Sequence, residues 1–286
     1  MINIVCGVNP NYNNENRINT IKRKLDIVSQ FIVLYHSIKK NWTDLEYEIS
    51  IMHNIDFNET DSERLSKLDV HIYKVKPDYE RLPVHSRVSC FQKKLKNEGT
   101  HRLVLDIDTI ALSNPVFDLD ADWQAMYGGS ASLKQKEIDY IIKKLNYNPV
   151  KKAGLQRDKL FIKYIQNPNA YESLYPYFNT GVILMKEELC HKYGEILLPA
   201  YCLAFQEEWG FPVDDSTRHI AIQYAMSYAL LTLSDNWKPF CPGINYLLKV
   251  YDINRFGKKN IQLLHYCGAD AENIVKREFK EYFADI

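Results

Sequence analysis

Short apolar runs alternate with amphipathic stretches through the first third of the chain. Brief runs rich in β-branched residues predict strands at 2–8, 47–53 and 70–75. Apolar positions at helical spacing predict helices at 18–39 and 86–96, and a polar loop is expected after the second strand. Strands that alternate with helices in this way are typical of an α/β domain built on a mainly parallel sheet.

The rest of the chain continues the alternation, with one basic interruption. The predicted elements are a turn at 111–115, a strand at 124–128, a polar turn entering a strand at 177–185, a helix from 187 to near 210, a helix at 214–230 capped by its first residues, a loop and strand at 237–248, and a strand at 261–268. We therefore expect one α/β domain over 1–286, with a mixed, mainly parallel sheet flanked by helices.

The stretch 103–109, Leu-Val-Leu-Asp-Ile-Asp-Thr, places two carboxylates at the end of a buried strand. Strand alternation would put Asp106 and Asp108 on one face, and ligands of open α/β sheets bind beyond the carboxyl ends of the strands. Two anions this close repel each other unless a cation lies between them or one of them takes a proton. Mg²⁺ or Mn²⁺, with diphosphate oxygens completing its shell, is the natural occupant. The alternative is an ordinary strand end without a ligand.

The interruption is a basic segment at 132–163, which carries nine Lys or Arg residues against three acidic ones. Apolar residues at helical spacing predict an amphipathic helix inside it. It is either a solvated insertion or a lid that faces an anionic or membrane-linked acceptor. The second interpretation leaves room for a peripheral membrane contact.

Composition excludes several classes of function. The chain has 286 residues, and 36 basic residues balance 36 acidic ones, so it carries no overall charge signature for nucleic acid. No apolar run approaches the roughly 18 residues that a membrane span needs, and no signal peptide is evident at the start. The six cysteines show neither a CxxC pair nor zinc spacing, which is typical of reduced thiols in a cytoplasmic protein.

Three motifs in one order give the sequence a family resemblance. Leu105-Asp-Ile-Asp108, Tyr177-Phe-Asn-Thr-Gly-Val182 and His265-Tyr-Cys-Gly268 follow a first strand with a polar, aromatic loop. In this the chain resembles the GT-A nucleotide-sugar glycosyltransferases, and among them family 8, the glycogenin and lipooligosaccharide galactosyltransferase type. The resemblance implies a GT-A, Rossmann-like fold with a nucleotide-sugar-binding half at 1–130, a helical insertion at 131–170 and an acceptor-binding half at 171–286.

The resemblance also implies the site and the reaction. Asp106, Asp108 and His265 would hold Mn²⁺ or Mg²⁺, and Arg87 would place a cation near the donor. The expected donor is a nucleoside-diphosphate sugar, with UDP as the nucleotide, and the expected acceptor is a hydroxyl of a glycan or glycolipid, with retention of configuration. The donor and nucleotide would contact Gly7, Val8, Asn9, Tyr12, Ile107, Thr180, Gly181 and Gly268, with Tyr12 stacking on the base.

The expected catalytic residues come from the second half. Asn179, with Thr180 and Gly181, would line the sugar and acceptor pocket. The family has an acidic residue by the donor sugar where Asp214 and Asp215 stand, and the helix register also allows Thr217 and Arg218. We take Asn179, Asp215 and Arg218 as the candidates.

The sequence departs from the family pattern at two places. The family continues past the glycine of the histidine motif into lysine, proline and tryptophan, whereas here the chain runs Ala269-Asp-Ala-Glu-Asn273. The lysine for the pyrophosphate is missing unless Lys276 or the basic segment replaces it. Asn9 also stands where an acidic residue is common. Both departures bear on the donor and on the stereochemical outcome.

Two alternatives from other classes compete. A phosphohydrolase of the haloacid dehalogenase type also uses an Asp-x-Asp at a strand end, but there the motif stands near the start of the domain, and Thr or Val would replace Ile110. A non-catalytic binder of nucleotide sugars would explain the missing lysine, and the complete set of Asp106, Asp108 and His265 argues against it.

Overall fold

The computed structural model describes residues 1–8, 25–76, 87–127, 178–204, 215–248, 257–266 and 269–283, with the backbone alone at 127, 201–204, 215–222, 224 and 269–270. Its centre is a sheet of seven strands in the order β3-β2-β1-β4-β7-β6-β8. The strands are β1 (Ile2–Gly7), β2 (Tyr47–His53), β3 (His71–Lys74), β4 (His101–Leu105), β6 (Trp123–Tyr127), β7 (Phe178–Lys186) and β8 (Trp237–Pro239).

The sheet is mixed and mainly parallel, as the pattern of elements predicts. Strands β3, β2, β1 and β4 run parallel to one another. Strand β7 runs antiparallel to both of its neighbours, β4 and β6, and β8 is parallel to β6. Strands from both predicted halves of the chain therefore share one sheet. The division of the chain into 1–130, 131–170 and 171–286 stays a prediction.

A second, three-stranded sheet was not expected from the sequence. It has the order β5-β10-β9, with β5 (Thr109–Ala111), β9 (Ile244–Leu247) and β10 (Leu263–His265). The chain leaves the large sheet at the end of β4 and enters the small one at β5, after three linking residues. The stretch 103–109 is therefore not one strand, and Asp106 and Asp108 lie in the link between two sheets.

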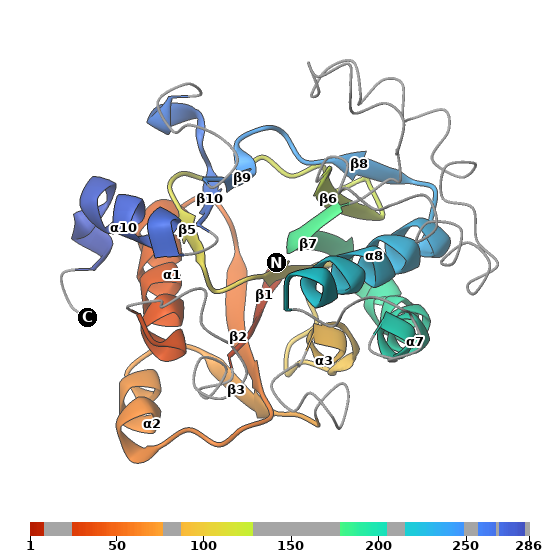
Figure 1. Cartoon of the computed structure of the whole chain (residues 1–286), viewed down its shortest axis with the longest axis horizontal. Coiled ribbons are helices and arrows are strands. Elements are labelled where there is room, and N and C mark those ends of the chain that lie inside the picture. Colours follow the sequence, from red (N-terminus) through yellow and green to blue (C-terminus); the bar gives the residue numbers. More distant parts are fainter. Residues whose placement is uncertain are drawn as a thin grey trace.

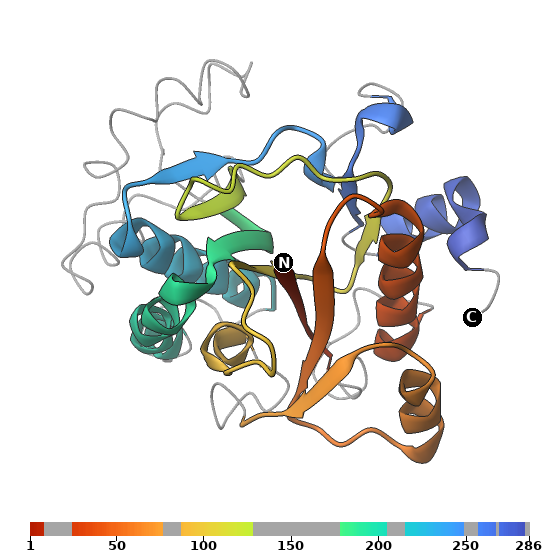
Figure 2. The ribbon, with the colours of Figure 1, turned by 180° about the vertical axis from the view of Figure 1, so that it is seen from behind.

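Helices cover both faces of the large sheet (Figure 1). α1 (Ile27–Asn41) and α2 (Glu59–Ser66) lie on one side, and α3 (Arg87–Gln92), α7 (Glu187–Ala204) and α8 (Asp215–Leu233) lie on the other. The reverse view shows the same three layers, with α10 (Ala269–Glu278) beside α1 at the edge (Figure 2). Two short 3-10 turns, η3 (Lys258–Asn260) and η4 (Lys280–Tyr282), complete the described elements.

Three clusters of buried apolar side chains fill the layers. One joins the large sheet to α3, α7 and α8, and a second joins it to α1. The third lies between the small sheet and α10 and includes Val33 of α1. Because apolar burial is the main favourable term in folding, these clusters fix both sheets against the same helix, α1. The link that carries Asp106 and Asp108 is thus anchored on both sides.

Helix boundaries differ from the sequence prediction where capping intervenes. α1 begins at Ile27, not at 18, because the Asp26 side chain accepts the backbone N–H of Ser29 and caps the helix there; residues 18–24 lie outside the described part. α2 replaces the polar loop expected after β2. The Asn58 side chain caps it and only Leu65 is buried, so apolar periodicity gave no signal for it.

α3 and the strand at 177–185 also needed correction. α3 ends at Gln92 instead of 96, because Nη1 of the buried Arg102 donates to the carbonyls of Cys90 and Phe91 at its end. Phe178 to Gly181, expected as a polar turn, belong to strand β7. Within the described residues, no helix combines the length and the apolar character that a bilayer crossing needs.

Candidate metal and ligand site

Three hydrogen bonds to backbone carbonyls hold the link between the two sheets, which runs from the end of β4 to the start of β5. The N–H of Asp106 donates to the carbonyl of Gly181 in β7 at 2.7 Å. The Thr109 hydroxyl donates to the Asp106 carbonyl at 2.7 Å, and the N–H of Tyr266 donates to the Asp108 carbonyl at 2.9 Å. The link is therefore tied to β7 on one side and to the end of β10 on the other, which fixes where its two carboxylates point.

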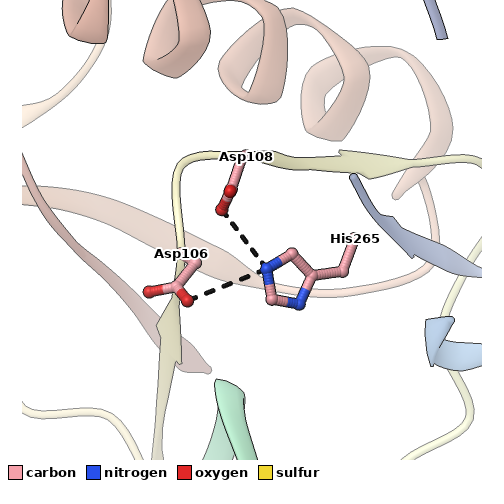
Figure 3. A group of neighbouring side chains, drawn as sticks. All are labelled: Asp106, Asp108 and His265. Carbon is pink, nitrogen blue, oxygen red and sulfur yellow. Dashed lines mark ion pairs between the residues drawn. The ribbon is translucent and has the colours of Figure 1, made fainter. Parts of the chain in front are cut away.

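Asp106, Asp108 and His265 converge on one point (Figure 3), and these three residues are called the metal group below. One ligand atom from each residue lies within 4.8 Å of the others. The His265 Nε2 lies 3.3 Å from Asp108 Oδ1 and 3.8 Å from Asp106 Oδ2. His265 and Asp108 are buried, with 3% and 8% of their surfaces exposed. The carboxylates meet because the link bends, and strand alternation plays no part.

These residues fit a divalent metal ion. Two carboxylate oxygens and one imidazole nitrogen form a donor set that suits Mn²⁺, and also Mg²⁺ where carboxylates and phosphate dominate. Gly181 leaves room beside them: a Cβ there would overlap the ring of His265 and come within 3.0 Å of Asp106 Oδ2. Uncompensated, the two carboxylates would repel each other in this partly buried setting, so a cation stabilises the arrangement.

Arg87 supplies a second positive charge at the same place. It is the first residue of α3, and its guanidinium forms an ion pair with Asp106 Oδ1. The other oxygen of that carboxylate, Oδ2, faces His265. Arg87 therefore stands beside Asp106, Asp108 and His265 without blocking the oxygen that faces the histidine, and its expected role near the donor stays a prediction.

Cys6 lies close to the site and is no candidate ligand. Among the described residues, the group whose ligand atoms gather at one point contains Asp106, Asp108 and His265 and does not contain Cys6. Burial also raises the pKa of the Cys6 thiol well above its usual range, with neighbouring Cys90 and Asp106 adding to the effect and Arg87 partly opposing it.

The residues of the Asn-Thr-Gly motif lie along β7, against the metal group. The pairing of β6 with β7 is interrupted there, because Ala125 pairs with Ile183 while the next residue, Met126, pairs with Asn179. The carboxamide oxygen of Asn179 accepts the N–H of Gly181 at 3.0 Å. The structure thus brings Gly181 against Asp106 and His265 and ties Asn179 to them through Gly181, whereas Thr180 is the buried residue between them in β7.

One residue of the site was missed by sequence reasoning. Asn245, in β9, is completely buried; its Oδ1 lies 2.9 Å from Nδ1 of His265, and its Nδ2 donates to Asn179 Oδ1 at 2.9 Å. It is also the only non-glycine residue with positive φ, 59°, among the described residues. The available signal was a polar residue between two apolar ones, Ile244 and Tyr246, in a predicted strand.

The remaining predicted residues are placed less completely. Gly7 ends β1 and Val8 follows it, its N–H bonded to the carbonyl of Met52 at 2.9 Å, so both lie at the carboxyl end of the central strand. Ile107 stands between the two aspartates. Four candidates lie outside the described residues: Asn9, Tyr12, Asp214 and Gly268. Three more, Asp215, Thr217 and Arg218, lie in α8 where only the backbone is described.

Lys276 does not replace the missing lysine in this arrangement. Its ammonium pairs with Glu272 of the same helix, α10, at 2.8 Å, and Glu272 is buried. The other candidate, the basic segment at 132–163, lies outside the described residues.

Comparison with known proteins gives a likeness in structure alone. No protein-family model matches the sequence, and no curated protein matches it. The crystal structure of the galactosyltransferase LgtC with donor and acceptor sugar analogues matches with a TM-score of 0.54 and 14% identity, over 99% of this chain and 96% of that one. An active-site mutant of LgtC matches at 0.55 and 15%, over 99% and 95%. Identity this low speaks for architecture only, and the chain therefore has the fold of the galactosyltransferase LgtC, as the GT-A resemblance of its three motifs predicted.

Proposed function

We propose that this protein is a metal-dependent glycosyltransferase that moves a sugar from a nucleoside-diphosphate sugar to a hydroxyl acceptor. The observation that carries the proposal is the convergence of Asp106, Asp108 and His265 at the carboxyl end of the central strands. The fold shared with LgtC supports the reaction class. The three motifs that were read as one site from the sequence come from three distant segments, and they meet in space.

The charges at the site suit the departure of a nucleoside diphosphate. A divalent ion bound by the three residues would neutralise the developing charge on the diphosphate. Arg87, anchored on the outer oxygen of Asp106, adds a second cation. Fixed positive groups aimed at the place where charge develops stabilise the transition state without reorganisation.

Neutral polar groups complete the pocket for the sugar. The oxygen of the Asn179 carboxamide is occupied by two donors, the N–H of Gly181 and Nδ2 of Asn245, so its NH₂ group is left to donate. We assign it to a sugar or acceptor hydroxyl, with the expected roles of Thr180 and Gly181 beside it. A UDP-sugar as donor, a glycan or glycolipid as acceptor, and a retaining outcome belong to the proposal through the family resemblance.

The test incubates the full chain with Mn²⁺ and a panel of nucleotide sugars and measures release of nucleoside diphosphate. We expect release with at least one donor, loss of release in EDTA, and a loss of 100-fold or more in Asp108→Asn and His265→Ala, since both remove metal ligands. Asp118→Asn is the matched control: it removes an equal charge from a partly exposed carboxylate that pairs with Lys238. Thermal unfolding should show that each variant folds.

Other outcomes would identify the alternatives. Hydrolysis of phosphomonoesters, with no release from any nucleotide sugar, would point to the phosphohydrolase. Binding of nucleoside diphosphate without turnover would point to a non-catalytic binder. Full activity in EDTA, or in Asp108→Asn, would overturn the proposed role of the metal.

A further inference from the structure

Asn245 occupies a strained position inside a strand. Leu263 of β10 pairs with Ile244, and the next residue, Leu264, pairs with Tyr246, so Asn245 is the extra residue of a bulge in β9. Its φ of 59° lies in the left-handed region, which is strained for most residues and which Asn tolerates best after Gly. Strain of this kind persists where the surroundings over-determine it. At this bulge the Asn245 side chain points toward His265.

A backbone donor decides the direction of every hydrogen bond around Asn245. The N–H of Gly181 can only donate, so the Asn179 atom that receives it must be the carboxamide oxygen. That same oxygen is 2.9 Å from the Asn245 amide, which must therefore present its NH₂ group. The oxygen of Asn245 is then the atom that faces Nδ1 of His265, at 2.9 Å. An oxygen at this distance requires a proton on Nδ1.

We propose that Asn245 is a positioning residue that holds His265 as its Nδ1–H form and so reserves Nε2 for the metal. The nitrogen that binds a metal is set by the hydrogen bond that the other one makes. Here Nε2 is the atom that faces Asp108 and Asp106, at 3.3 and 3.8 Å. The part of this proposal that concerns the metal rests on the proposed function, whereas the part that places a proton on Nδ1 of His265 rests on the hydrogen bonds alone.

The same amide links the metal ligand to the pocket for the sugar. Through its NH₂ group Asn245 holds the oxygen of Asn179, and through its oxygen it holds the ring of His265. All three residues are buried, with exposed fractions of 8% or less. Loss of the Asn245 side chain should therefore loosen both groups, whereas loss of its donor alone should affect Asn179 and spare His265.

The decisive variant is Asn245→Gly. Glycine adopts a positive φ freely, so this change removes the side chain without adding backbone strain. Asn114→Gly is the matched control, because Asn114 hydrogen-bonds only Thr43 and Asp44 among the described residues, outside the site. Two measurements apply: the ring ¹⁵N shifts of His265 in metal-free protein at a pH where the ring is neutral, and the Kd for Mn²⁺ alone by calorimetry.

In the wild type and in Asn114→Gly we expect the proton on Nδ1. In Asn245→Gly we expect the proton to redistribute toward Nε2, and the Kd for Mn²⁺ to rise by about 10- to 100-fold. Asn245→Asp is the second variant, used also if the glycine variant does not fold. Its carboxylate still accepts from Nδ1–H but cannot donate to Asn179, so the Nδ1–H form and Mn²⁺ binding should persist while affinity for donor sugar falls.

The outcomes separate this inference from the proposed function. An unchanged proton position and an unchanged Kd in Asn245→Gly would overturn the positioning role. An Nε2–H ring in the wild type would overturn it as well. If the wild type binds no Mn²⁺ but shows the Nδ1–H ring that Asn245→Gly loses, the positioning role stands and the metal-dependent function fails.

Discussion

At the scale of single residues, Gly181 sets how closely β7 approaches the metal group. Its carbonyl accepts the N–H of Asp106, and its own N–H fixes the Asn179 carboxamide. The space where a side chain would lie is filled by the ring of His265. A glycine is needed here for close approach and not for an unusual φ, because Gly257 is the glycine with positive φ among the described residues. The Asn-Thr-Gly motif thus has a structural role in the packing of the neighbouring segments, in addition to any contact that it makes with a ligand.

We expect Gly181→Ala to weaken Mn²⁺ binding by at least tenfold, because the methyl group would displace the ring of His265 and press on Asp106 Oδ2. A stability loss of about 1–3 kcal/mol should accompany it, as in other overpacked cores. Calorimetric titration with Mn²⁺ and thermal unfolding measure the two effects.

Gly194→Ala in α7 is the control for that substitution. There the three atoms nearest to the added methyl all belong to the side chain of Gln92, which must shift to admit it, and alanine favours the helix. It should leave Mn²⁺ binding unchanged. Equal Kd values for Gly181→Ala and the wild type would show that His265 and Asp106 do not hold the metal together.

At the scale of elements, Asp122 joins β6, β7 and the end of α8. Its carboxylate accepts hydrogen bonds from Lys186 at 2.8 Å and from Ser234 at 2.6 Å, and its backbone carbonyl accepts the N–H of Lys186. The hydrogen bond from Lys186, followed by that from Ser234, lowers the pKa of Asp122. One charged group thus ties these three elements together.

This pKa shift makes stability depend on pH at the acid end. A carboxyl group whose pKa is lowered by folding stabilises the native state above the unfolded pKa, near about 3.9, and the contribution is lost as the pH falls through the folded value. Asp122→Asn should therefore lower the free energy of unfolding at pH 7 by about 1 kcal/mol. The difference from the wild type should shrink below about pH 4.

Urea unfolding at pH 7 and at acid pH measures that difference. Asp120→Asn changes an exposed neighbouring carboxylate and should cost little at either pH. A loss for Asp122→Asn that is the same at both pH values would contradict the electrostatic explanation.

At the scale of the whole molecule, two sheets share the helix α1 and meet at the link between β4 and β5. Asn41 at the end of α1 shows the connection, because its side chain donates to the Ala111 carbonyl of β5 and to the Tyr282 hydroxyl of η4. The metal group lies at this junction, with Asp106 following a strand of the large sheet and His265 ending a strand of the small one. Neither sheet alone holds the three ligands.

The basic segment at 132–163 is attached where its removal would disturb the sheets least. Tyr127, the last residue of β6, pairs directly with Phe178, the first residue of β7. Residues 128–131 and 164–177 suffice to connect two residues that already lie side by side. We therefore expect a deletion of 132–163 to fold, with a melting temperature within a few degrees of the wild type.

If the segment covers the acceptor, the deletion variant should still hydrolyse the donor with Mn²⁺ but lose transfer to acceptor. Release of nucleoside diphosphate and formation of the glycosylated product measure the two separately. Unaltered transfer would show that the segment does not serve the acceptor, and unfolding of the variant would favour a structural role for the segment.

The sequence pattern alone located most elements of the large sheet and the three motifs of the site. Buried strands repeat apolar residues over a few positions, so β1, β2 and β4 could be read locally, and Asp106 and Asp108 stood out because they end an apolar run. The sequence pattern did not predict α2, because this helix buries only Leu65. A helix stabilised by its cap and by surface charge leaves no apolar periodicity to detect.

Tertiary structure decided what the motifs form together. The second sheet, the bend that turns both carboxylates toward His265, and the pairing of Arg87 with Asp106 depend on contacts between residues far apart in the chain. Asn245 is the clearest case, since its sequence context is an ordinary strand and its importance comes from a bulge and two hydrogen bonds. Local patterns record which face of an element is buried, whereas the direction of a side chain in a junction is set by the packing of both sheets, which no short stretch of sequence contains.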